Sequence, residues 1–246
     1  MAKSLPLKAS LACLRLRSGL RHSRRLSTNI DEIIDKNHAW SIKNKEWFET
    51  HGRKPHKPQY LWIGCSDARV SPNLMLDTQP GQVLVHRNIA NLVVNTDMSL
   101  MSVLHYAVSV LHVPHVIVCG HYDSGGVRAS MARSSLGSRD LAPPLENWLG
   151  HIRDVHRLHH EELDALQDGE ARHRRLVELN VMEQCTNLYK TGTVQRRMIE
   201  HRKSGAVPPL QIHGLVYDPH TGRLSKVPLT DKTVHEVDTV YQLFEH

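Results

Sequence analysis

A short run of apolar, mostly β-branched residues constrains the fold of this chain more than any other feature. The segment His115-Val116-Ile117-Val118-Cys119-Gly120 has no polar residue between Val116 and Cys119, so a strand here would bury both of its faces. Strands of this kind belong to parallel sheets that are covered by helices on either side. The run therefore predicts an α/β fold built on a central, mostly parallel sheet.

Other short segments of the chain also have the pattern of strands. Three are expected at 60–65, 83–86 and 210–217, and the turn at 218–222 leads into an antiparallel partner at 223–227. Together with the run at 115–120, they predict about four parallel strands plus one antiparallel strand.

Helical spacing of apolar residues separates the expected strands. Helices are expected at 98–112 and over 145–202, the latter with breaks near Gly169 and Gly192. An amphipathic helical arm is expected at 30–51, ahead of the first strand. The alternation of strands and helices supports an α/β fold, with helices flanking the sheet.

The positive charge of the chain is concentrated at its N-terminus. The 246 residues include 31 Lys+Arg and 25 Asp+Glu, a formal charge of +6. Residues 1–30 hold seven basic and no acidic residues, which leaves 24 basic and 25 acidic residues in the rest of the chain. A nearly neutral body argues against nucleic acid as a partner. The sequence has no run of about 18 apolar residues, the length that predicts a membrane span.

The basic N-terminal segment has the composition of an organellar transit peptide. It is rich in Arg, Ser and Leu, and the stretch 24–27 resembles a mitochondrial processing site. We therefore expect residues 1–28 to be a transit peptide and residues 29–246 to form a single domain. The expected location is the mitochondrion, followed by the plastid. The alternative is that this segment is the disordered basic tail of a cytosolic protein.

Residues that can bind a metal follow two of the expected strands. Cys65 and Asp67 come at the end of the first strand, and His121 directly follows the strand at 115–120. Because parallel strands end at the same edge of a sheet, these side chains can converge there. A thiolate, an imidazole and a carboxylate are plausible ligands for Zn²⁺. Each motif alone is weak, because a buried Cys more often packs in a core and a lone His more often forms a hydrogen bond.

The chain resembles the β-class carbonic anhydrases over roughly residues 35–230, with the matching stretches in the same order. They are Trp62-Ile63-Gly64-Cys65-Ser66-Asp67-Ala68-Arg69, His86-Arg87-Asn88-Ile89-Ala90-Asn91, Cys119-Gly120-His121-Tyr122-Asp123 with Gly125-Gly126-Val127, 147–149 with 151–154, 178–181, and 212–214 with Tyr217. The resemblance implies a zinc lyase that reversibly hydrates carbon dioxide to bicarbonate and a proton.

The resemblance also implies roles for individual residues. Cys65 and His121 would be zinc ligands, Asp67 an exchangeable carboxylate ligand, and Arg69 the partner that holds Asp67 away from the metal. A guanidinium beside a carboxylate keeps it ionised and binds it with two hydrogen bonds. Asp67 would then accept a hydrogen bond from the water that zinc activates. The alternative is that Asp67 and Arg69 form only a structural surface ion pair.

Trp62, Arg87 and Tyr217 form a second set. In the bicarbonate-regulated members of the family, residues at these positions make a pocket for a non-catalytic bicarbonate, with which Arg87 would pair. Occupancy of the pocket would favour binding of Asp67 to zinc, which closes the site. The alternative is that Trp62 and Tyr217 are core aromatics and Arg87 is a structural cation.

One position departs from the family pattern. The second Cys ligand stands three residues after the His, and Ser124 occupies that position here. A hydroxyl is not ionised near pH 7, so the site loses one negative charge, and its zinc affinity should fall unless Asp67 and water fill the gap. Cys119 and Cys185 are expected to pack in the core rather than replace the ligand. Three explanations stay open: an engineered change, a natural loss that leaves a non-catalytic relative, or zinc binding with reduced activity.

The expected function is zinc-dependent hydration of carbon dioxide, with one Zn²⁺ per subunit and an activity that Ser124 impairs. The alternative is a non-catalytic bicarbonate-binding or structural subunit. The arm at 30–51 is expected to pack on a neighbouring copy in a homodimer or tetramer, as in relatives whose active site lies near the dimer interface. His156 and His160 are expected to share a polar helix face and not to form a second metal site.

Overall fold

A computed structural model of the chain describes residues 29–132 and 143–229. The chain divides into two compact units, one ending at Pro55 and the other beginning at His56. The first contains two helices, α1 (Ile30–Lys43) and α2 (Lys45–His51), where a single helical arm was expected. Neither helix buries a residue. Their large exposed apolar side chains are Ile30, Ile33, Ile34, Trp40, Ile42 and Phe48.

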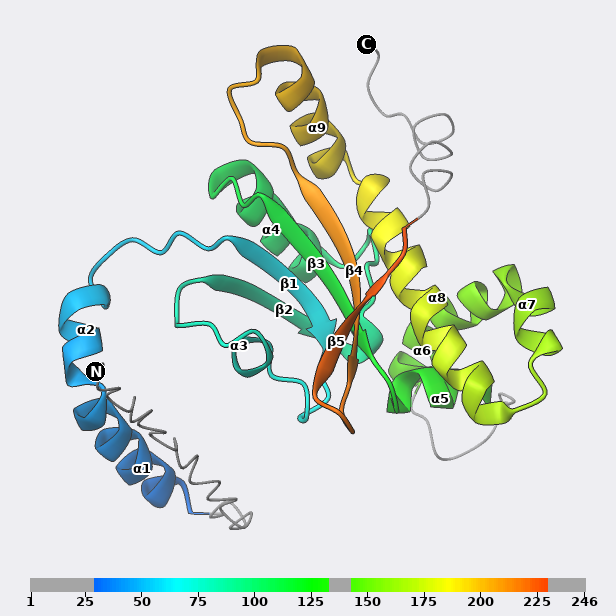
Figure 1. The fold of residues 1–246 in the computed structure, drawn as a ribbon, viewed down its shortest axis with the longest axis horizontal. Helices are drawn as coiled ribbons and strands as arrows, with labels where there is room; N and C mark the ends of the chain where they lie inside the picture. The colour runs from blue at the N-terminus through cyan, green and yellow to red at the C-terminus, as the bar shows by residue number, and fades with distance from the viewer. Residues whose placement is uncertain (1–28, 133–142, 230–246) are drawn as a thin grey trace, which may run out of the picture. The chain divides into compact units, whose positions relative to one another are not determined.

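The second unit is built on a five-stranded sheet with the order β2-β1-β3-β4-β5 (Figure 1). The strands are β1 (Tyr60–Cys65), β2 (Val83–Asn88), β3 (His115–His121), β4 (Gln211–Asp218) and β5 (Arg223–Val227). The first four are parallel, and β5 pairs with β4 in the antiparallel direction. The expected α/β fold, with four parallel strands and one antiparallel strand, is confirmed.

Helices and helical turns connect these strands. They are α3 (Pro72–Met75), the 3-10 turn η1 (Ile89–Asn91), α4 (Met98–His105) followed by the π-helical turn η2 (Tyr106–Val110), α5 (Gly125–Met131), α6 (Pro143–Leu158), α7 (His160–Ala165), α8 (Gly169–Tyr189) and α9 (Gly192–Ser204). Within the part of the chain that the structure describes, none of the helices is long and apolar enough to cross a membrane.

The expected helical breaks at Gly169 and Gly192 are the first residues of α8 and α9. Asp168 and Thr191 cap these helices, with side-chain oxygens that accept hydrogen bonds from backbone N–H groups of the first turn. A further break at His159 was not expected. It places His156 on α6 and His160 on α7, so the expectation that they share one helix face is wrong.

The core lies on both faces of the sheet because neighbouring strand residues point in opposite directions. Leu61, Ile63 and other residues on one face belong to a large cluster that includes residues of α4, α6 and α8. Trp62 and Cys119 belong to a smaller cluster on the other face. Cys185 is buried in the large cluster, so both cysteines occupy the packing positions expected for them.

Candidate metal centre

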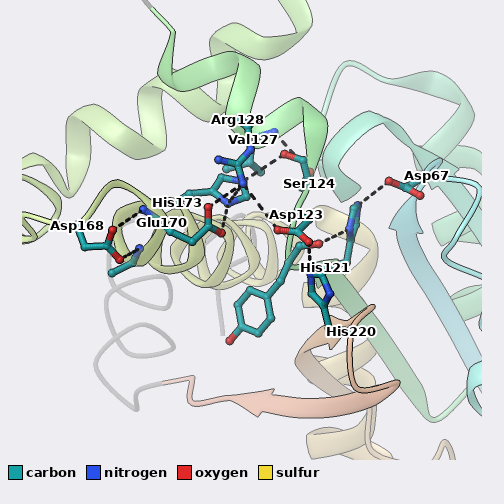
Figure 2. A network of polar contacts seen from close by, with 12 residues as sticks. Asp67, His121, Asp123, Ser124, Val127, Arg128, Asp168, Glu170, His173 and His220 are labelled. Carbon is teal, nitrogen blue, oxygen red and sulfur yellow. Dashed lines mark hydrogen bonds and ion pairs between the residues drawn. The ribbon is translucent and has the colours of Figure 1, made fainter.

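The carboxyl ends of β1 and β3 bring the candidate ligands together. The two strands are neighbours in parallel register, with Gly64 opposite Cys119, so both chains leave the sheet at the same edge. Nε2 of His121 lies 3.9 Å from Oδ2 of Asp67 across this edge (Figure 2). The structure therefore places Asp67 and His121 side by side, and the sulfur of Cys65 interacts with the same His121 side chain.

The His121 imidazole has a defined orientation. Its Nδ1 lies 2.8 Å from the carbonyl oxygen of Tyr122. Because a carbonyl oxygen only accepts hydrogen bonds, Nδ1 carries the proton, and in the neutral ring Nε2 carries the lone pair. Nε2 is buried and has no hydrogen-bond partner. A buried polar atom without a partner is rare, and here it is the atom that would bind a metal.

The surroundings of the Cys65 thiol favour its ionised state, in which thiols bind metals. Burial alone would raise its pKa, but the pKa is lowered because the sulfur interacts with His121 and with the backbone N–H groups of Asp67 and Ala90. Burial would likewise lower the pKa of His121, yet the neighbouring sulfur raises it. A bound cation would replace the proton that these two side chains compete for.

Arg69 holds the Asp67 carboxylate through three hydrogen bonds. The backbone N–H and Nε of Arg69 donate to Oδ1 over 2.9 Å and 3.0 Å, and Nη2 donates to Oδ2 over 2.7 Å. These bonds lower the pKa of Asp67 to about 2. Asp67 is therefore ionised at neutral pH and is held in one orientation beside His121.

Removal of this guanidinium by the change Arg69→Gln should cost stability at neutral pH but not in acid. The low folded-state pKa of Asp67 contributes stability above its unfolded value of 3.8, and this contribution disappears as the pH falls toward 2. The side chain of Arg69 is 51% exposed, so we expect a loss of at most about 1 kcal/mol. Urea unfolding at pH 7 and at or below pH 2 measures this, and an equal loss at both values would contradict the assignment.

Ser124 lies in the loop at 122–124 that joins β3 to α5, here called the site loop, and it already has a role in the fold. Its side chain is buried, and its Oγ accepts a hydrogen bond of 3.4 Å from the backbone N–H of Val127, which caps α5. Its carbonyl oxygen lies 3.3 Å from Nε2 of His173 on α8. Cys65, His121 and Asp67 thus offer the kinds of donor that zinc binds, whereas Ser124 offers only a neutral oxygen that a helix N-terminus already uses.

Comparison with known proteins identifies the family. A family model for carbonic anhydrases matches residues 60–224. The carbonic anhydrase of Emericella nidulans is 43% identical over 206 residues, which cover 82% of this chain and 85% of that protein. The chain belongs to the β-carbonic anhydrase family.

Solved structures of β-carbonic anhydrases share its fold. The crystal structure of CafA from the fungal pathogen Aspergillus fumigatus matches with a TM-score of 0.72 at 32% identity. The match covers 87% of this chain and 99% of the CafA chain. A tetrameric β-carbonic anhydrase from Sordaria macrospora matches with a TM-score of 0.69 at 33% identity, over 80% and 96% of the two chains.

Of the three residues expected to bind bicarbonate, two are aromatic residues in an apolar cluster, and the third, Arg87, bonds to backbone carbonyl oxygens. Trp62 is fully buried, and Tyr217 packs against the same apolar cluster. The indole Nε1 of Trp62 is a buried donor without a partner. Arg87 donates from Nε to the carbonyl oxygen of Cys65 over 2.8 Å and from Nη2 to that of Asp67 over 2.5 Å. Arg87 therefore fixes the backbone on which two candidate ligands stand.

A second polar cluster, which sequence reasoning missed, lies beside the site loop (Figure 2). Ligand atoms of Asp123, Glu170 and His173 lie within 4.8 Å of one another. Nη2 of Arg128 lies 3.0 Å from Glu170, 3.7 Å from Asp123 and 3.2 Å from His173. Because the Arg128 guanidinium already pairs with both carboxylates, we assign the cluster a structural role. Asp123 lies at least 47 residues before Glu170 and His173, which both stand on α8, so no local sequence motif marks this cluster.

Proposed function

We propose that this chain catalyses the reversible hydration of carbon dioxide to bicarbonate and a proton, with one zinc ion per subunit. Cys65 and His121 would hold the ion, with Ser124 or water completing the shell and Asp67 as the carboxylate that can exchange onto it. The observation that carries the proposal is the buried Nε2 of His121, which forms no hydrogen bond and lies 3.9 Å from the carboxylate of Asp67. Zinc, when bound, lowers the pKa of a water molecule to about 7 and so supplies a nucleophile at neutral pH.

The side chains of the site would orient this reaction. Asp67 is ionised, and its carboxylate lies 3.9 Å from the nitrogen of His121 that faces the metal position. It would accept a hydrogen bond from the attacking water and direct the oxygen lone pair toward carbon dioxide. Arg69 keeps the carboxylate in place, and Arg87 holds the backbone beneath it. The neutral Ser124 should leave the metal weakly bound and the activity reduced.

Metal analysis of the purified full chain together with stopped-flow carbon dioxide hydration tests this function. We expect the rate to rise with added zinc and to be lost in His121→Ala. A second candidate is a non-catalytic bicarbonate-binding or structural subunit, which the engagement of the Ser124 hydroxyl as a helix cap favours. Absence of both zinc and a rate above buffer, even in excess zinc, would select that candidate.

We also propose that Trp62, Arg87 and Tyr217 bind a regulatory bicarbonate. The unpartnered indole N–H of Trp62 supports this role, since an anion would give the buried donor an acceptor. Arg87 adds a positive charge and connects this region to the backbone of Asp67. Binding there would act on Asp67 through those carbonyl contacts, consistent with the expected closure of the site.

We further propose that the arm formed by α1 and α2 packs on a neighbouring copy of the chain in a homodimer or tetramer. The arm buries none of its own residues, and the side chain of Trp40 packs edge-on against Phe48 with ring centroids 5.3 Å apart. The tetrameric relative from Sordaria macrospora supports such an assembly.

The double change Trp40→Ser with Phe48→Ser should weaken subunit association. Loss of one buried large apolar side chain costs about 1.5–3 kcal/mol, which corresponds to an increase in the dissociation constant of about tenfold or more. Sedimentation at several protein concentrations measures this. His38→Ser provides the control, because His38 points away from Trp40 on α1. Unchanged association in the double variant would exclude the arm as the interface.

The basic segment at 1–28 lies outside the described residues. We propose that it is a transit peptide that directs the domain at 29–246 to the mitochondrion, on the strength of its acid-free, Arg-rich composition. Import of the full chain into isolated mitochondria, with plastids as the comparison, tests this location.

A further inference from the structure

We propose that His220, in the turn between β4 and β5, is a positioning residue for the metal centre and acts through Asp123. This inference rests on the proposed function, because it concerns the geometry of the same site. Nε2 of His220 lies 2.5 Å from Oδ2 of Asp123 (Figure 2). Asp123 stands between His121 and Ser124 in the loop that joins β3 to α5.

Asp123 has a backbone conformation that needs support. Its φ angle is +57°, in the left-handed region. An L-residue other than glycine in this region costs about 1–2 kcal/mol, although Asp tolerates it better than most. This residue redirects the chain from the end of β3 to the start of α5. It therefore fixes how the His121 side chain and the residue at position 124 lie relative to each other.

Three side chains hold Asp123 in this conformation. Beside His220, Arg128 lies 3.7 Å from Oδ1, and Nη2 of Arg69 donates to the backbone carbonyl oxygen over 3.2 Å. Since Arg69 also holds Asp67, Asp123 connects the turn at His220 to both parts of the candidate centre.

The turn that presents His220 is closed by its own contacts. Oδ1 of Asp218 accepts a hydrogen bond of 2.9 Å from the backbone N–H of His220, and the carbonyl oxygen of Asp218 accepts one of 2.8 Å from Gly222. Gly222 has a φ angle of +71°, which a glycine adopts without strain. The turn therefore does not depend on Asp123 for its shape, and it can impose a position on the loop.

Partners outside the ligand shell typically change metal affinity by about 10–100-fold when they are removed. We expect His220→Ala to raise the dissociation constant for Co²⁺, a spectroscopic substitute for zinc, by about tenfold. The ligand-field absorption of bound Co²⁺ should shift as well, because the angle between donors changes. His220→Gln keeps a nitrogen donor at nearly the same distance from the backbone, so we expect it to restore most of the affinity and the spectrum.

The experiment uses the full chain with Ser124 and, in parallel, with the change Ser124→Cys. His105→Ala, an exposed histidine on α4, is the matched control. If His220→Ala lowers the melting temperature but leaves the Co²⁺ affinity and spectrum unchanged, His220 is merely structural and the inference is wrong. If no Co²⁺ binds to either parent protein, the proposed function fails and this inference with it. If Co²⁺ binds to at least one parent protein, failure of this inference can be told apart from failure of the proposed function.

Discussion

Replacement of Ser124 by cysteine should increase the zinc affinity of this protein by about 100-fold or more. The change supplies a thiolate at a position where the structure has a neutral hydroxyl, and zinc strongly prefers sulfur to such an oxygen. Removal of residues beyond the ligand shell already lowers metal affinity by about 10–100-fold, so restoring a ligand should raise the affinity by more than that range. Competition against a chelator of known affinity measures the change, and carbon dioxide hydration should rise with metal occupancy.

The same substitution should have the opposite effect on the protein without metal. The Ser124 hydroxyl caps α5 through the N–H of Val127, and cysteine is a poor cap. We expect Ser124→Cys to lower the stability of the metal-free protein by up to about 1 kcal/mol, whereas with zinc it should be the more stable form. Thermal unfolding with and without a chelator measures both effects.

The control for added sulfur is Ser66→Cys, which places a thiol on an exposed residue next to Cys65. Ser66→Cys should not increase the zinc affinity, because the side chain at position 66 does not stand at the ligand position. If Ser124→Cys gives neither tighter zinc binding nor a faster reaction, then the residue at 124 does not face the metal. The assignment of Cys65, Asp67 and His121 would then also need revision.

The change Asp67→Asn should reduce carbon dioxide hydration by about 100-fold or more in the Ser124→Cys protein. A positioned proton acceptor typically contributes a factor of about 10²–10⁴ to the rate of such a reaction. An amide has nearly the same shape as a carboxylate but lacks its charge. It therefore forms a weaker bond to Arg69 and is a poorer acceptor for the attacking water.

Parallel metal analysis separates the two roles that Asp67 can have. If Asp67 only orients water, the Asn variant keeps its zinc. If Asp67 instead occupies the ligand position that Ser124 leaves weak, Asp67→Asn loses zinc in the protein that retains Ser124 but keeps it in the Ser124→Cys background, where the added thiolate is a further ligand. Asp154→Asn on the exposed face of α6 is the control for charge alone. An Asp67→Asn enzyme of full activity would exclude the dyad from the reaction.

Local sequence patterns predicted most of the sheet. The runs at 60–65 and 223–227 match β1 and β5, because a buried strand needs an uninterrupted apolar run and a hairpin needs a turn such as Asp218–Gly222. The break at His159 was missed because the surrounding residues include neither Gly nor Pro. The short helix α5 was also missed. It begins with two glycines, and the Ser124 cap is its main local signal.

The candidate centre was predictable only where its residues follow strands. Cys65, Asp67 and His121 come directly after apolar runs, so the rule that parallel strands end at one edge brings them together. The contact between Asp123 and His220 joins residues 97 positions apart, and a single exposed histidine in a turn has no distinctive pattern. Such contacts depend on how the β4–β5 hairpin closes over the loop, which the tertiary structure decides.

The cap formed by Ser124 also bears on how the protein depends on its metal supply. A cysteine at this position would tie the start of α5 to an ion, so that a shortage of zinc would also loosen the loop. The serine hydroxyl instead holds the helix start by a bond within the chain. The folded shape of this loop should therefore depend less on metal supply than that of a loop tied by a cysteine ligand.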